Sequence, residues 1–494
     1  MPSPTEGGNF RFRSSQSPLA LIKERGEFSL NTVSLFVEQA ERHPDRMALW
    51  LPGSAPVNFR ELSRRSGGAQ NHLKSKGLKK GDSVLLMDPL SPRLYGMVTA
   101  CLAQGACILF VEPWMKADRI ALLIEKIQPR YFIAGWKGRI WGLRIPAIRR
   151  IPHWIWPQEA WEQEGDVQIE DVSADTPGIL TFTSGTTGLP KGVLRAHGYM
   201  RAQHQVLNDA LGFEEFSSPD LCIFANFALA NLASGRGSVI VPPGWKKKDF
   251  RAVQNLSENQ LPETLTSGPA FLKALLSHGG LPSLRSIHIG GALTDTSLFE
   301  EGFHQWPTAH WSHIYGSSEA EPVAVSDAHE AVQKSKDRGY FQTLYLGKPV
   351  PPLSSRVETD TVWISGPHVG PEYWGGDSPE NRVNKKRENG VLWHNMGDRV
   401  LSDDQGWWYM GRSQQDRELF LTEQKVFKEL DHSRAFIQPT AKGPWLFGED
   451  LTPDLFKAFS LAGQTNLKIV RDARHRARID RPASLSKGAP WALG

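Results

Sequence analysis

The feature that most constrains this fold is an alternation of strand and helix patterns between about residues 31 and 135. TVSLFVEQAERH at 32–43 carries apolar residues at helical spacing, and GDSVLLM at 81–87 indicates a short buried strand that a Gly-Asp turn opens. LYGMVTACLAQG at 94–105 predicts a helix that ends on Gly105, and ACILFV predicts the next strand. Repeated strand–helix units of this kind indicate crossover connections and a parallel sheet.

Beyond this region the pattern divides the chain into unequal parts. Residues 136–175 indicate connecting material, alternation resumes to about 325, and polar residues 326–345 suggest a long loop. Short strand patterns from 346 predict a small distorted β-barrel, and the character changes after Gly411-Arg412. We therefore expect an α/β fold: an N-terminal arm at 1–30, a large domain of parallel or mixed sheets with helices at 31–412, and a small α+β domain at 413–494.

Composition excludes several classes of protein. A net charge of +4 over 494 residues suits an anionic small molecule but does not indicate nucleic-acid binding. Three cysteines form no disulfide or zinc pattern; Cys101 and Cys107 lie in an apolar stretch, which favours buried thiols and a reducing, cytoplasmic setting. Neither a signal peptide nor a transmembrane helix is expected, and the 17 scattered tryptophans favour core packing over a membrane-interface role.

The most specific motif is TFTSGTTGLPKG at 181–192, which directly follows an apolar strand. Glycines let backbone N–H groups approach oxyanions, hydroxyls donate further hydrogen bonds, and a lysine supplies charge. The spacing is not that of a Walker loop, and the alternative is a flexible Ser/Thr/Gly turn. The residues that carry the motif are Thr183, Ser184, Gly185, Thr186, Thr187, Gly188 and Lys191.

Three further motifs carry polar groups suited to a nucleotide. Residues 315–319 read Tyr-Gly-Ser-Ser-Glu, which could also be a capped helix start. A turn of Gly290, Gly291 and Ala292 follows a strand pattern. Asp398 follows Met-Gly, and Arg412 lies fourteen residues later. A carboxylate matches a vicinal diol, although Asp398 could instead be a β-turn aspartate.

Together these motifs resemble the adenylate-forming superfamily of acyl-CoA synthetases, luciferases and peptide-synthetase adenylation domains. The resemblance covers about residues 30–412 and, weakly, the tail. It implies that the 181–192 loop and Lys191 hold the ATP β,γ-phosphates and the leaving pyrophosphate. It places adenine against Tyr315, Gly316 and the Gly290–Ala292 turn. It also implies that Ser318 contacts the α-phosphate and Glu319 binds Mg²⁺, a cation that a carboxylate beside phosphates independently favours. Asp398 and Arg412 would hold the ribose.

The chain departs from the family pattern in several places. Ser318 replaces the usual threonine, and Arg478 in DARHRARIDR stands where the family has a catalytic lysine, unless this stretch is only a solvated basic run. Gln414 lies nearest to the usual hinge residue, and no glycine occurs from 413 to 442, which weakens the case for CoA or carrier-protein thiolation. Residues 375–378 read GGDS like a phosphopantetheine site, but Pro379 and polar residues follow, so we reject that interpretation.

The resemblance predicts ATP-dependent activation of a carboxylic acid as acyl-AMP, with release of pyrophosphate. WHNMGD and RHRARIDR resemble the β-lactone synthetases of bacterial olefin biosynthesis, in which the hydroxyl of a β-hydroxy acid attacks the acyl carbon and expels AMP. The alternatives are an acyl-CoA ligase, with CoA use left open, and a nucleotide-binding pseudo-enzyme or scaffold in a multi-enzyme assembly. By analogy of fold, the acyl pocket is expected near 226–236 and 288–316.

Overall fold

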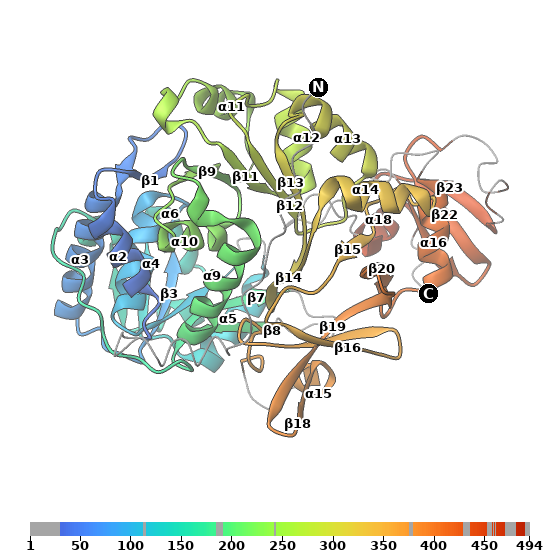
Figure 1. Cartoon of the computed structure of the whole chain (residues 1–494). Helices are drawn as coiled ribbons and strands as arrows, with labels where there is room; N and C mark the ends of the chain where they lie inside the picture. The colour runs from blue at the N-terminus through green and yellow to red at the C-terminus, as the bar shows by residue number, and fades with distance from the viewer. Residues whose placement is uncertain are drawn as a thin grey trace, which may run out of the picture.

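A computed structural model of the chain describes residues 30–111, 115–183, 191–241, 244–374, 379–427, 435–451, 457, 459, 461–469 and 481–489. These residues form two large mixed sheets, one antiparallel sheet and one small sheet (Figure 1). The predicted α/β class, with a smaller antiparallel piece and an α+β tail, is confirmed.

The first large sheet has six strands in the order β6-β5-β3-β4-β7-β8. All neighbours are parallel except β7 and β8, which pair antiparallel at one edge. The strands are β3 (Ser83–Met87), β4 (Cys107–Phe110), β5 (Tyr131–Ala134), β6 (His153–Ile155), β7 (Pro177–Thr183) and β8 (Lys191–Ala196).

The second large sheet has eight strands in the order β14-β13-β12-β11-β9-β10-β1-β2. Its interior is parallel, and an antiparallel pair closes each edge. The strands are β1 (Met47–Trp50), β2 (Val57–Asn58), β9 (Asp220–Cys222), β10 (Ser238–Ile240), β11 (Thr264–Ser267), β12 (Ser286–Gly290), β13 (His310–Ser317) and β14 (Ala320–Asp327).

Helices cover both sheets because their apolar stripes need a partner surface. One core joins α2 (Val33–Arg42), α3 (Phe59–Ser75), α4 (Pro92–Ala103) and α10 (Ala225–Ala233) to strands of both sheets, and a second covers the other face of the six-stranded sheet with α5 (Ala117–Ile127) and α7 (Pro146–Arg149). A third core packs four helices on the outer face of the eight-stranded sheet: α11 (Lys247–Gln254), α12 (Pro269–Ser277), α13 (Thr296–Gln305) and α14 (Ala328–Asp337). The other helices of this region are α6 (Trp136–Gly142), α8 (Pro157–Trp161) and α9 (His197–Leu211).

The C-terminal third is built mainly from antiparallel strands. The sheet β15-β20-β19-β17-β16, with β18 on β19, leads to a three-stranded sheet that lies at the far end of the molecule, beside α16 (Figure 1). The elements are β15 (Tyr345–Gly347), β16 (Ser354–Glu358), β17 (Thr361–Ser365), α15 (Pro379–Asn384), β18 (Lys385–Glu388), β19 (Val391–Ser402), β20 (Trp407–Arg412), α16 (Arg417–Val426), β21 (Ala435–Thr440), β22 (Gly443–Gly448), β23 (Gly463–Asn466) and α18 (Arg481–Gly488).

Two predicted connections were wrong. Within 136–175 the chain forms α6, α7, β6 and α8, elements of three to seven residues that Gly and Pro separate and that are too short for periodicity to reveal. The predicted loop at 326–345 contains α14, whose N-cap Asp327 accepts from the Glu330 amide. An N-cap aspartate followed three residues later by glutamate is a helix-start signal.

The other local predictions hold. The helix and strand patterns up to residue 111 became α2, β3, α4 and β4, and Gly105 adopts a left-handed φ of 69° just beyond α4. Cys101 and Cys222 are buried, Cys107 is partly buried, and all three thiols are free. Among the described residues, no helix is long and apolar enough to cross a bilayer. The boundaries at 30 and 412 stay predictions.

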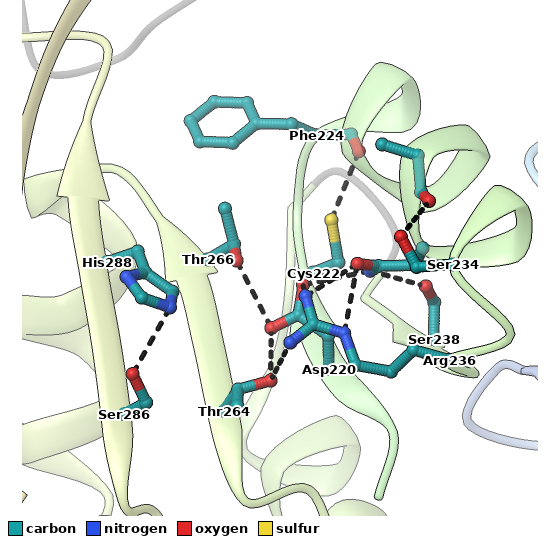
Figure 2. A network of polar contacts seen from close by, with 12 residues as sticks. Asp220, Cys222, Phe224, Ser234, Arg236, Ser238, Thr264, Thr266, Ser286 and His288 are labelled. Carbon is teal, nitrogen blue, oxygen red and sulfur yellow. Dashed lines mark hydrogen bonds and ion pairs between the residues drawn. The ribbon is translucent and has the colours of Figure 1, made fainter. Parts of the chain in front are cut away.

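A buried polar network at the start of β9 ties the eight-stranded sheet to α10 (Figure 2). Asp220 accepts from Thr264 Oγ1 at 2.8 Å and from Asn231 Nδ2 at 3.0 Å. The guanidinium of Arg236 donates to Asn231 Oδ1 at 2.6 Å and lies 3.9 Å from the Asp220 carboxylate, and both charged side chains are fully buried. His288, on β12 beside this network, bonds Ser286, and burial lowers its pKa to about 3.

Candidate active site

The predicted phosphate loop connects two paired strands. β7 ends at Thr183 and β8 begins at Lys191, and these two residues are direct cross-strand partners. The residues between them, Ser184–Gly188 of the motif included, lie outside the described residues, as do Arg478 and the GGDS segment. The strand pairing therefore fixes both ends of the loop and holds Lys191 at the edge of the six-stranded sheet.

Most of the residues predicted to contact adenine and ribose gather around one cavity of about 300 Å³. Its lining includes Gly291, Ala292, Tyr315, Gly316, Asp398 and Arg412, together with residues of α16, β21 and Arg481. Gly291 has a φ of 78°, a left-handed conformation that favours glycine. The cavity thus has walls from the eight-stranded sheet, from the antiparallel sheet and from the C-terminal segment.

The Tyr-Gly-Ser-Ser-Glu motif is a connection between strands and not a helix start. β13 ends at Ser317 and β14 begins at Ala320, so Ser318 and Glu319 form the turn. The Ser318 carbonyl accepts from Arg195 Nη2 at 3.0 Å. The alternative interpretation of a capped helix is therefore wrong.

Asp398 and Arg412 face each other across neighbouring strands. They are direct partners in the β19–β20 register, and Arg412 Nη1 lies 2.9 Å from Asp398 Oδ1. Tyr315 donates its hydroxyl to Asp398 Oδ2 at 2.6 Å. Asp398 lies within β19, which excludes the β-turn alternative. The Asp398 charge raises the pKa of Arg412, so the aspartate and arginine persist as an ion pair on the cavity wall.

A second cluster lies around Tyr373 and brings Lys191 close to Glu319. The Tyr373 hydroxyl donates to Glu319 Oε1 at 2.7 Å, and Lys191 Nζ lies 5.5 Å from the Tyr373 ring centre. Burial opposes ionisation of Glu319, but His394, the Tyr373 hydroxyl and Lys385 outweigh it, so the pKa of this carboxyl is lowered. The cluster therefore presents an ionised carboxylate beside a lysine, as a phosphate and divalent-cation site needs.

Lys385 is the residue of this cluster that the sequence did not reveal. It begins β18, its side chain is buried, and Nζ donates to the Gly370 carbonyl at 2.7 Å. Burial lowers its pKa to about 8. Nζ also lies 5.3 Å from the centre of the Tyr373 ring. The WHNMGD motif contains His394, which is the cross-strand partner of Lys385, but a lysine in a polar stretch gave no signal of burial.

A third polar contact joins the side chains of Glu321 and Asn226. Asn226 in the first turn of α10 donates to Glu321 Oε2 at 2.9 Å. Tyr199 is buried beside Glu321, Glu319 and Arg195. A Cβ on Gly291 would lie 3.4 Å from Phe224 Cζ, so the start of α10 is next to this residue of the cavity wall. Asn226 lies in one of the two ranges where the acyl pocket was expected, whereas Glu321 and Tyr199 lie outside both.

The structure therefore brings the predicted residues together as two adjoining groups. Gly291, Ala292, Tyr315, Gly316, Asp398 and Arg412 line the cavity, and Lys191 and Glu319 lie around Tyr373. Gly290 lies at the end of β12, with no room for a side chain because a Cβ would be 2.8 Å from the Ile314 carbonyl oxygen. The individual roles assigned to these residues stay predictions.

Comparison with known proteins finds similarity to AMP-binding enzymes. The sequence profile of the family described as AMP-binding enzyme matches residues 36–374. An olefin beta-lactone synthetase of Stenotrophomonas maltophilia is 24% identical, over 78% of this chain and 79% of its own length. The peroxisomal OPC-8:0-CoA ligase 1 of Arabidopsis thaliana is 23% identical, over 81% and 77%. The solved fatty acyl CoA synthetase of Mycobacterium tuberculosis superposes with a TM-score of 0.70 at 15% identity, over 92% of this chain and 97% of that structure.

Proposed function

Because the chain belongs to the AMP-binding enzyme family, we propose that it activates a fatty or β-hydroxy fatty acid as acyl-AMP and releases pyrophosphate. The observation that carries this proposal is the pairing of two polar groups. Asp398, Arg412 and Tyr315 line the cavity, and Lys191 and Glu319 gather around Tyr373. The first group suits a ribose diol, and the second suits phosphates.

The chemistry follows from these groups. The acid's carboxylate attacks the α-phosphorus in line and pyrophosphate leaves. Lys191 would neutralise the leaving group, as would Arg478, which lies outside the described residues. Glu319 fits Mg²⁺, since this ion is commonly held by one or two carboxylates together with substrate phosphates, and the ion would supply charge neutralisation. The Tyr373 bond engages Oε1 of Glu319, so Oε2 is the oxygen that would bind the ion.

The Asn226–Glu321 pair favours a substrate with a hydroxyl near its carboxyl group. A wholly apolar acyl chain would leave this pair facing hydrocarbon, which costs free energy. A β-hydroxyl could donate to the Glu321 carboxylate. In the lactone-forming route this hydroxyl oxygen then bonds to the acyl carbon, the bond from that carbon to the phosphate oxygen breaks, AMP leaves, and the hydroxyl proton passes to solvent.

The deciding experiment is carboxylate-dependent ATP–pyrophosphate exchange with matched fatty and β-hydroxy fatty acids, followed by product analysis with and without CoA. We expect exchange with at least one acid and a β-lactone without CoA. A thioester formed only when CoA is added would support the acyl-CoA ligase instead. No exchange with any acid would support the nucleotide-binding pseudo-enzyme or scaffold. Cytoplasmic location and a multi-enzyme assembly stay predictions.

A further inference from the structure

A surface distant from this site combines exposed apolar side chains with positive charge. The described residues expose nine large hydrophobic side chains, and five of them lie between residues 122 and 156. Trp136 is 62% exposed, Ile140 50%, Leu143 56% and Trp156 38%. Positions 136, 140 and 143 recur at the spacing of one helix face, on α6 and the residue that follows it. The tryptophans were predicted to pack in the core, but Trp136 and Trp156 are exposed.

The same segment has a charge unlike the rest of the chain. Residues 136–156 contain five basic residues and no acidic residue, whereas the whole chain has a net charge of only +4. Lys137, Arg144, Arg149 and Arg150 are exposed. The segment therefore carries more positive charge than the entire protein, and the remainder is close to neutral.

Contacts between rings and cations order this surface. The Arg139 guanidinium lies 3.7 Å from the centre of the Trp156 ring, and Lys137 Nζ lies 5.3 Å from the Trp136 ring. Arg139 also donates to the Ala134 carbonyl at the end of β5. These contacts tie α6 to the chain after β6, so the exposed rings are held on a rigid sheet edge.

We propose that residues 136–156, the Trp/Arg segment, form a docking face for the surface of a bilayer that contains anionic phospholipids. Tryptophan and aliphatic side chains enter the interfacial region, while Lys and Arg are attracted to acidic headgroups. Glu125 of α5 pairs with Arg150 at 3.7 Å, and the segment itself has five basic residues and no acidic residue across 21 positions. This excess of positive charge is the charge complementarity that selects the partner. The inference does not depend on the proposed function.

The position of the segment keeps docking separate from catalysis. β6 is one edge of the six-stranded sheet, and β8, which begins with Lys191, is the other. Five strand spacings separate them, about 24 Å across the sheet. A protein seated on a membrane by this face would therefore leave the nucleotide site open, and variants of the face should keep activity on water-soluble acids.

The test is co-sedimentation of the full chain with vesicles of phosphatidylcholine alone or with about a third phosphatidylglycerol. We expect binding only to the anionic vesicles, weaker at higher salt. Reversing three charges (Arg144→Glu, Arg149→Glu, Arg150→Glu) should weaken binding at least tenfold. The matched control reverses the exposed Lys246, Lys247 and Lys248, which have the same total charge. Absence of wild-type binding, or equal loss in the control, would overturn the proposal.

A second measurement does not rely on charge reversal. Leu143→Cys, labelled with an environment-sensitive dye, should shift its emission to the blue with anionic vesicles, whereas labelled Val391→Cys, also at an exposed position, should not. Equal shifts at both positions would overturn the proposal. So would sedimentation velocity showing a dimer that Leu143→Ser breaks, since the face would then bind a second copy of this chain.

Discussion

The Asp220 network and the candidate active site both place carboxylates near cations inside the protein. They differ in whether a ligand can reach the charged groups. Asp220 and Arg236 are fully buried, and threonines, an asparagine and a serine of neighbouring elements surround them. Asp398 lines a cavity, and Glu319 lies partly exposed in the turn between β13 and β14. Each carboxylate accepts from a tyrosine of a segment far away in sequence. A buried charge with only internal partners indicates a structural role, whereas one beside a cavity is available to a ligand.

The largest effect should be a loss of stability when Asp220, in the fully buried network, is replaced. Asp220→Ala would leave Arg236 buried without its counter-charge, and breaking such a pair costs about 3–5 kcal/mol of stability. Urea denaturation followed by circular dichroism should show a clearly lower midpoint. Asp45→Ala is the control, because its pair with Arg60 is exposed and such pairs contribute little. Equal midpoints for the two variants would refute the distinction.

Glu319→Gln should show the reverse pattern. The protein should keep its unfolding temperature, while ATP–pyrophosphate exchange falls about 100-fold or more, since one charged group that stabilises the transition state contributes about that much. The control is Glu358→Gln, on β16 away from the cavity. An unchanged exchange rate in Glu319→Gln would remove this residue from the reaction.

Asp398→Asn should act on nucleotide binding. A hydrogen bond to a charged group contributes about 1.5–3 kcal/mol, so the KM for ATP should rise about 10- to 100-fold with a smaller change in kcat. Steady-state exchange rates at varied ATP concentration measure this split. A fall in kcat at unchanged KM would argue against ribose binding by Asp398.

The smallest effect concerns pH and the buried His288. Burial lowers its pKa to about 3 in the folded protein, so its contribution to stability is present above pH 6.5 and is lost as the pH falls, because the unfolded chain binds the proton first. At pH 5 this loss amounts to about 2 kcal/mol. His288→Gln should flatten the decline of stability between pH 6.5 and 5, and His310→Gln, at an exposed position, should not. Parallel declines would show that His288 is protonated when folded.

Local sequence patterns predicted most of the sheet-and-helix frame, because buried strands and amphipathic helices leave periodic signals. They also pointed to Asp398 and Arg412, because Asp398 belongs to a recognisable Met-Gly-Asp motif. The pairing of the two residues depends on the β19–β20 register, which the structure shows. They missed α6 to α8, which have only four to seven residues each. They also missed Lys385, whose burial depends on Tyr373 and Gly370 in another segment. Burial of a lone polar side chain is a tertiary property without a local pattern.

The mixed origin of the cavity walls has a thermodynamic consequence. Arg481, which lines the cavity, forms an ion pair with Glu423 of α16 and donates to the Ile437 carbonyl of β21. A nucleotide that touches this wall gains contacts only when the C-terminal segment is in place, so binding and local folding are linked. Nucleotide should therefore slow amide hydrogen exchange in β21 and β22, and a chain ending at 412 should bind the same nucleotide more weakly.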